Sequence, residues 1–205
     1  ADGQKMLNEA HLKKKKADAE AEKQKKAAET ASNSASTSGY TDPATVPGSH
    51  LFTDIKYTNI FLTGATGFLG IYLLADLLEA FPLANVHCLV RASSDEEAMK
   101  RLEEAIEFAH MAQLYPELRP GTAMFARIKA VAGDLGETER FGMSQAKWDY
   151  LCDHVDSIYH NGVWVNLLFP YEVLRNANVV STVLLLKMAM SGAKKRKAFH
   201  YISTL

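Results

Sequence analysis

The sequence predicts an α/β fold built on a doubly wound parallel sheet over residues 51–205. From about Leu51, short β-rich apolar runs alternate with helical stretches, which is typical of βαβ units. The first run leads directly into three glycines spaced three apart, in the segment TNIFLTGATGFLG at 58–70. Because crossover connections between parallel strands share one hand, we expect the strand order 3-2-1-4-5.

Each strand and helix can be assigned from its own residues. Prolines end two of the helices, Asp95 and Ser144 are candidate N-caps, and Gly192 closes the last helix. The expected strands are Asn59–Thr63, Val86–Arg91, Ala126–Ala132, Ser157–His160 and Ala198–Ser203. The expected helices are Leu69–Phe81, Glu96–Leu114, the segment from Ser144 to Cys152, and Pro170–Met190.

Residues 1–50 differ in composition from the rest of the chain. Residues 1–38 consist mainly of Ala, Lys, Glu, Gln and Ser, with hardly any large apolar side chain after Leu12, so they cannot build a core. We expect a charged helix within Leu7–Thr30 and then a flexible linker, which together form a tether. Acidic residues nearly balance the lysines, which disfavours a nucleic-acid-binding arm. The charged helix is a candidate surface for a partner.

The composition is ordinary for a soluble globular protein, and we expect the protein to be cytoplasmic. The 205 residues are 47% hydrophobic and carry a formal net charge of -1, so no basic face favours nucleic acid. No apolar run reaches the roughly 18 residues that a membrane span requires. Cys88 and Cys152 lack the spacing of zinc ligands or of a disulfide framework. We therefore expect two reduced core cysteines and no metal site.

The glycines at 64, 67 and 70 predict a binding site for a dinucleotide. Gly64 allows a tight turn off the first strand, Gly67 removes a side chain that would block a phosphate, and Gly70 lets the helix lie close to the sheet. The backbone N–H groups of Thr66–Leu69 would then face a pyrophosphate at the positive end of the helix dipole. Glycines also simply make turns, but here they stand between a strand and a helix.

The end of the second strand indicates which dinucleotide binds. Enzymes that prefer NAD commonly place an acid there for the ribose 2′-hydroxyl, whereas this chain places Arg91 in the segment HCLVRASS. A guanidinium that pairs with the 2′-phosphate would select NADP(H), and Arg101 is a second candidate for the same contact. The alternative for both residues is an ordinary solvated arginine.

Several segments together resemble the thioester reductase domains of nonribosomal peptide synthetases. They are TGATGFLG, LVRA, AGDL, YHNG, FPYEVLRNANVVST and the terminal HYIST. Carboxylic acid reductases and aminoadipate reductase carry similar domains, which are extended short-chain dehydrogenase/reductases with a Rossmann-like fold. The resemblance covers about Asp54–Leu205. It implies that NADPH reduces an acyl thioester, held on the phosphopantetheine arm of a carrier domain, to an aldehyde and sometimes to an alcohol.

The resemblance also implies roles for individual residues. Thr204 would hydrogen-bond the substrate carbonyl, and Val163 stands where the family often has a smaller Ala. The pyrophosphate loop would consist of Gly64, Thr66, Gly67, Phe68 and Leu69. The 2′-phosphate would contact Arg91, and the adenine would lie beside Asp134 and Leu135. At the end of the fourth strand, the cofactor would be lined by Asn161 and Gly162.

These residues also have plainer interpretations. Asp134 follows a glycine and Asn161 precedes one, so both are good turn residues, and Thr204 is equally suited to the end of a strand. His160 is a candidate general base. A histidine on a buried strand, however, is more often a hydrogen-bonded core residue, and we favour that interpretation.

The sequence departs from the family at its end. Short-chain reductases supply a catalytic acid as a Tyr followed four residues later by a Lys, downstream of the Thr strand, and none is present before Leu205. We therefore expect the N-terminal portion of such a domain, with its sheet and substrate pocket incomplete. The chain also begins with Ala, which suggests processing or excision. The alternative is a non-catalytic NADP-binding or scaffold subunit.

Overall fold

A computed structural model describes residues 56–193 and 196–203. They contain a five-stranded sheet in the order β3-β2-β1-β4-β5, and every neighbouring pair is parallel. This confirms the predicted fold class and strand order. The charged helix and linker expected over residues 1–50 lie outside the described residues. The strands are β1 (Asn59–Thr63), β2 (Asn85–Val90), β3 (Ile128–Ala132), β4 (Ser157–His160) and β5 (Ala198–Tyr201).

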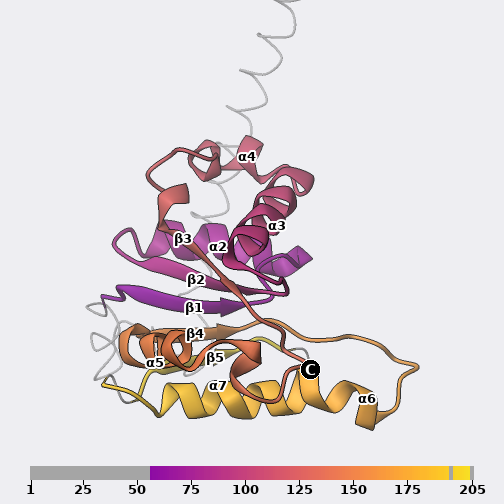
Figure 1. Ribbon diagram of the computed structural model, residues 1–205. Coiled ribbons are helices and arrows are strands. Elements are labelled where there is room, and N and C mark those ends of the chain that lie inside the picture. The colour runs from indigo at the N-terminus through magenta and orange to yellow at the C-terminus, as the bar shows by residue number, and fades with distance from the viewer. Residues whose placement is uncertain (1–55, 194–195, 204–205) are drawn as a thin grey trace, which may run out of the picture. The chain divides into compact units, whose positions relative to one another are not determined.

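Helices cover both faces of the sheet (Figure 1). One face carries α2 and α3, and the other carries α5 and α7. No helix in the described part of the chain is long and apolar enough to cross a membrane. The helices are α2 (Phe68–Ala80), α3 (Asp95–Phe108), α4 (Met111–Leu114), α5 (Gln145–His154), α6 (Tyr171–Arg175) and α7 (Ser181–Ala189), with a π-helical turn at Asn176–Val180.

The predicted single helix from Glu96 to Leu114 was wrong. The chain leaves the helix after Phe108, because His110 adopts a left-handed conformation with φ 54°, and α4 starts afresh at Met111. The predicted N-cap was also displaced by one residue. Ser94 caps α3 by accepting the N–H of Glu97, which leaves the carboxylate of Asp95 free to accept the N–H of Ala132.

The other helix limits agree better with the prediction. Ser144 caps α5 by accepting the N–H of Lys147, as expected. The helix expected from Pro170 to Met190 has Pro170 as its N-cap and ends at Ala189, but the π-helical turn interrupts it. The third strand starts at Ile128 and not at Ala126, because Phe125–Arg127 forms a 3-10 turn.

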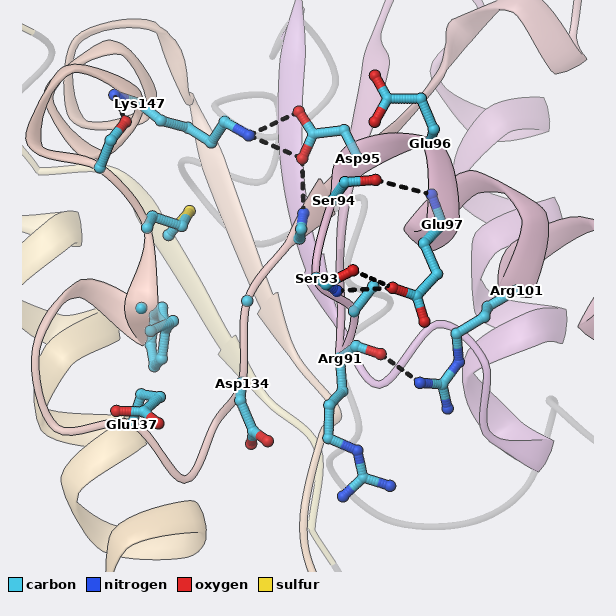
Figure 2. Close-up of a pocket in the computed structure, with 17 residues that line it drawn as sticks. Arg91, Ser93, Ser94, Asp95, Glu96, Glu97, Arg101, Asp134, Glu137 and Lys147 are labelled. Atoms are coloured by element: carbon cyan, nitrogen blue, oxygen red, sulfur yellow. Dashed lines mark hydrogen bonds and ion pairs between the residues drawn. The ribbon is translucent and has the colours of Figure 1, made fainter.

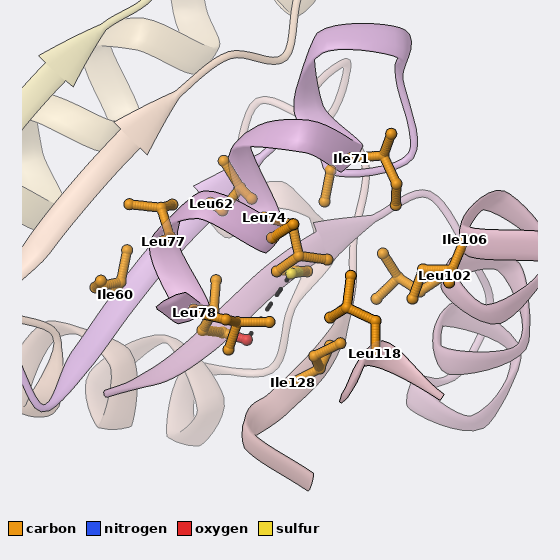
Figure 3. Close-up of a cluster of buried hydrophobic side chains, with 14 of the residues drawn as sticks. Ile60, Leu62, Ile71, Leu74, Leu77, Leu78, Leu102, Ile106, Leu118 and Ile128 are labelled. Carbon is orange, nitrogen blue, oxygen red and sulfur yellow. Dashed lines mark hydrogen bonds between the residues drawn. The ribbon is translucent and has the colours of Figure 1, made fainter. Parts of the chain in front are cut away.

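The larger hydrophobic core lies between the sheet and the helices α2 and α3 (Figure 3). Leucines and isoleucines of β1, α2 and α3 interdigitate there, and Leu74, Leu78 and Leu102 are fully buried. A second core lies on the opposite face, where Phe61 and Ile158 of the sheet pack with residues of α5 and α7. The inner strands β1, β2 and β4 are therefore buried from both sides, which explains why β1 and β2 read as nearly continuous apolar runs.

Both cysteines are free thiols in these two cores, as predicted. Cys88 of β2 is fully buried in the first core, and Cys152 of α5 belongs to the second. Burial raises the pKa of both thiols, because it disfavours the thiolate. Both are therefore inert packing residues at neutral pH.

The guanidinium of Arg127 fastens the C-terminal end of α2 to the turn before β3. Its Nη2 donates to the carbonyl of Leu78 at 2.6 Å, and its Nη1 donates to those of Phe81 and Ala84, each at 3.0 Å. The last carbonyls of a helix have no partner within the helix itself. A single charged side chain thus satisfies three carbonyls at the end of α2 and in the loop before β2.

We predict that Arg127→Met lowers the free energy of unfolding by about 2–3 kcal/mol, because three charge-assisted hydrogen bonds are lost at once. Urea denaturation followed by circular dichroism measures the loss. The matched control is Lys129→Met, since Lys129 makes one exposed bond, to the carbonyl of Ala126. Equal losses for the two variants would contradict the role assigned to Arg127.

Candidate functional site

The turn after β1 is shaped by glycines that pack on one another. Gly64 adopts φ +73°, and the N–H of Gly67, the N-cap of α2, donates to its carbonyl at 3.0 Å. A Cβ on Gly70 would lie 1.8 Å from that same carbonyl oxygen. Gly70 is therefore required because the first turn of α2 crosses the end of β1. This crossing is the close approach of helix and sheet that the sequence predicted.

The end of β4 closes against the same turn. A Cβ on Gly64 would lie 2.7 Å from the backbone of Gly162, and a Cβ on Gly162 would lie 2.6 Å from Leu135. The amide of Asn161 donates to the carbonyl of Gly64 at 3.3 Å. Asn161 and Gly162 therefore support the glycine-rich turn through their contacts with Gly64.

Candidate residues follow each of the first four strands directly, so they share the carboxyl edge of the sheet. Ligands of doubly wound sheets bind at this edge. A pocket of about 590 Å³ lies there, and its walls include β1–α2, the end of β2, the segment after β3 and the π-helical turn. Six predicted residues line it: Gly64, Thr66, Arg91, Arg101, Asp134 and Leu135.

The remaining predicted residues lie elsewhere. Gly67, Phe68 and Leu69 form the N-terminal end of α2, where Phe68 is 86% and Leu69 is 53% exposed. Asn161 and Gly162 support the turn and do not line the pocket. Thr204 lies outside the described residues. Trp164 and Asn176 also line the pocket, although neither was a predicted site residue and the aromatic and leucine side chains of 164–186 were expected to be mostly core.

Two arginines bring positive charge to the end of β2 (Figure 2). Both side chains are exposed, and Nη1 of Arg101 donates to the backbone carbonyl of Arg91. Neither forms a salt bridge within residues 56–193 and 196–203. Asp134 faces the same space, and its Oδ1 accepts the N–H of Gly136 at 2.8 Å. Asp134 therefore makes the turn that the plainer interpretation expected, and it also lines the pocket.

Nearby acids are tied to other partners. The Glu97 carboxylate accepts hydrogen bonds from the hydroxyl and the N–H of Ser93, which lower its pKa. Burial raises the pKa of Asp95, but hydrogen bonds from Ala132 and Lys147 outweigh this effect and the pKa is lowered. The ammonium of Lys147 lies 2.6 Å from Asp95. These four side chains line a second cavity of about 850 Å³, which also includes Arg91, Arg101 and Asp134.

His160 of β4 is buried beneath the turn. Its Nδ1 lies 2.8 Å from the Thr63 hydroxyl, and its Nε2 lies 3.1 Å from that of Thr182. Burial lowers the pKa of His160 to about 4. These contacts favour the core interpretation over that of a general base. No three His, Cys, Asp or Glu side chains of the described residues gather as metal ligands would.

Comparison with known proteins identifies the family. The family model NAD_binding_4, described as male sterility protein, matches residues 62–205. The chain belongs to this family. The match also confirms the resemblance to thioester reductase domains, since relatives at about 40% identity are enzymes of the expected kinds.

Two curated relatives and one solved structure illustrate the similarity. One component of the linear gramicidin synthase of Brevibacillus parabrevis is 44% identical over 150 residues, which are 73% of this chain and 3% of that protein. The L-2-aminoadipate reductase large subunit of Penicillium chrysogenum is 43% identical over 141 residues, which are 68% of this chain and 9% of that protein. The reductase domain of a nonribosomal peptide synthetase from Mycobacterium tuberculosis superposes with a TM-score of 0.60 at 37% identity, covering 73% of this chain and 33% of that one.

We predict that Gly64→Ala destabilises the protein by about 2–4 kcal/mol. Alanine is strained in the left-handed conformation of this residue, and its Cβ would clash with the backbone of Gly162. Gly121→Ala is the matched control: Gly121 has φ +90°, but an added Cβ would meet nothing within 4 Å. This control should cost only about 1–2 kcal/mol. Thermal or urea unfolding measures both. Equal costs would mean that the contact with Gly162 is unimportant.

We predict that His160 makes stability fall as the pH is lowered. Its pKa is about 4 in the folded protein, against an ordinary value of 6.5, so the unfolded chain binds the proton first between these values. In His160→Gln the free energy of unfolding should therefore decline less steeply between pH 6.5 and 4.5, by up to about 1.4 kcal/mol per pH unit. Urea titrations at several pH values measure the two slopes. Identical slopes would show that His160 is not held neutral.

Proposed function

We propose that the pocket at the carboxyl edge of the sheet binds NADP(H), and that the protein containing it reduces a carrier-bound acyl thioester to an aldehyde. One observation carries the proposal. The glycine-rich turn, Arg91 and Asp134 come from the ends of three neighbouring strands and line a single pocket. The chain spans 3–9% of the two curated relatives and a third of the solved domain described above, so the activity of the whole protein is part of this proposal.

The residues of the pocket are suited to the parts of the dinucleotide. We assign the pyrophosphate to the turn at Gly64 and to N–H groups within Thr66–Leu69, because α2 is a 13-residue helix with its positive end there. The N–H of Gly67 is not among them, because it already donates to the carbonyl of Gly64. Asp134 and Leu135 are assigned to the adenine side. Gly162 and Asn161 take a supporting role, because they hold the turn in its conformation.

Arg91 and Arg101 are the residues assigned to the 2′-phosphate. Both guanidinium groups are exposed at the pocket and form no salt bridge among the described residues, whereas Glu97 and Asp95 are engaged by Ser93 and Lys147. A guanidinium at this position favours a phosphate over the neutral 2′-hydroxyl of NAD, and Arg91 is the stronger candidate because Arg101 also interacts electrostatically with Glu97. This contrast supports NADP(H) as the cofactor.

The chemistry follows from the family resemblance. When bound, NADPH would supply the hydride for the thioester carbonyl carbon; the C–S bond then breaks, and the carrier's thiol leaves with a proton to give the aldehyde and NADP+. Thr204, which follows β5 in the sequence and lies outside the described residues, is assigned as the hydrogen-bond donor to that carbonyl. The relatives' names support a reductase that works on peptide-synthetase or amino-acid substrates, since one is a gramicidin synthase and another an aminoadipate reductase. We therefore propose a phosphopantetheine-bearing carrier domain as the partner.

We predict that Arg91→Ala weakens the binding of NADPH by about 10–100-fold and the binding of NADH by less than about threefold. The reason is that Arg91 makes its charge-assisted hydrogen bonds to the 2′-phosphate, which NADH lacks. Calorimetric titration measures both affinities. Lys100→Ala is the control, because Lys100 lies on the same helix as Arg101 but pairs with Glu104. Equal losses of NADPH and NADH in Arg91→Ala would rule out the assignment.

We predict that the native protein carrying this chain oxidises NADPH when given an acyl-pantetheine thioester, and that it does so much more slowly with the free acid. Absorbance at 340 nm follows the cofactor, and trapping with a hydrazine identifies the aldehyde. NADPH binding without thioester-dependent oxidation would favour the non-catalytic NADP-binding subunit. Absence of NADPH binding would overturn the cofactor assignment as well.

A further inference from the structure

A chain of hydrogen bonds starts at the glycine-rich turn and runs into the sheet. The N–H of Gly162, which packs on Gly64, donates to the hydroxyl of Thr63 at 2.9 Å. That hydroxyl lies 2.8 Å from Nδ1 of His160. Thr63 is completely buried and His160 is 2% exposed, so water does not compete for these bonds.

The same chain continues to the opposite wall of the pocket. Nε2 of His160 lies 3.1 Å from the hydroxyl of Thr182 on α7, and this hydroxyl donates to the carbonyl of Asn178 at 2.8 Å. The side-chain amide of Asn178 clamps the backbone of Trp164: it accepts from the N–H at 2.8 Å and donates to the carbonyl at 3.0 Å. Asn178 lies in the π-helical turn, a feature that is frequent at functional sites.

The direction of the bonds is fixed along the whole chain. The Thr182 hydroxyl donates its proton to the carbonyl of Asn178, so it must accept from His160, whose Nε2 therefore carries the hydrogen. Nδ1 of His160 then accepts the proton of the Thr63 hydroxyl, which leaves the Thr63 oxygen free to accept from Gly162. A neutral histidine in one tautomer satisfies every group, which agrees with its burial.

The two ends of the chain lie at two walls of the same pocket: Gly162 packs against the wall that contains Gly64, and Trp164 is part of the other wall. Gly64 and Thr66 form one wall, and Val163, Trp164 and Asn176 form another. The segment after Gly162 needs such a restraint, because its side chains pack poorly: Val165 is 75% and Leu167 is 96% exposed. The described hydrogen bonds from this segment to α6–α7 run through Asn178.

We propose that His160 is a positioning residue that, through Thr63 and Thr182, fixes the Trp164 segment at a set distance from the glycine-rich turn. This inference rests on the proposed function, since it takes the pocket between those two walls to be the cofactor site. His160 touches neither cofactor nor substrate. It acts by holding the two walls in their binding positions before the ligand binds. This lowers the entropic cost of ordering the site on binding.

Thr182→Val tests the link, because valine keeps the shape of threonine and removes its hydroxyl. The background is Trp148→Phe, which leaves Trp164 as the sole tryptophan of a sequence that has two. We expect acrylamide to quench Trp164 fluorescence more strongly in the ligand-free variant. We also expect calorimetry to show NADP+ binding weakened about tenfold, as for the loss of one buried hydrogen bond.

Three further variants make the test specific. Ser181→Ala is the matched control, because the Ser181 hydroxyl makes the same kind of bond one residue earlier, to the carbonyl of Ala177, and stands outside the chain. It should change neither quenching nor affinity. Thr182→Ser keeps the hydroxyl and should restore both. Asn178→Ala alters a partly exposed side chain and should reproduce the Thr182→Val effects without disturbing the core.

The outcomes separate this inference from the proposed function. The positioning role is overturned if acrylamide quenches Trp164 fluorescence in Thr182→Val and Asn178→Ala no more strongly than in the parent protein. It is also overturned if quenching rises while the affinity for NADP+ stays the same. If the parent protein binds no NADP+, the cofactor assignment is overturned. The quenching comparison, made without ligand, then still decides whether the hydrogen-bond chain positions Trp164.

Discussion

The geometry of the site depends on the close approach of two strand ends. Gly64 and Gly162 leave so little space that a Cβ on the first would lie 2.7 Å from the backbone of the second. Gly70 extends the constraint into α2, because the first helical turn passes over the carbonyl of Gly64. β1, β4 and α2 are thereby locked at one point, and the pocket is bounded by the segments that leave that point.

Electrostatics adds selectivity to this frame. At the end of β2 the carboxylates of Asp95 and Glu97 are held by Lys147 and by Ser93, whereas Arg91 and Arg101 form no salt bridge with any described residue. Lys147 therefore neutralises Asp95, whereas Glu97 keeps its charge and also interacts electrostatically with Arg101. The guanidinium of Arg91 remains without an ion-pair partner among the described residues, and an anionic ligand group is its natural partner at the pocket.

Much of the fold and part of the site could be predicted from sequence. The strand order followed from the alternation of strand and helix, and the shared position of Gly64, Arg91 and Asp134 followed because parallel strands end at one edge. The break at His110 and the π-helical turn were missed. A local pattern of residues does not show where packing forces a left-handed residue or an extra residue into a helix.

Local residue patterns and the handedness of crossovers were sufficient to predict the five strands, their order and the residues at their ends. The tertiary structure was needed to show that Gly70 passes over the carbonyl of Gly64, that Lys147 pairs with Asp95, and that the side chain of Asn178 binds the backbone of Trp164. These contacts join residues brought together by packing, and their chemistry depends on burial and distance, which no single segment of the chain encodes.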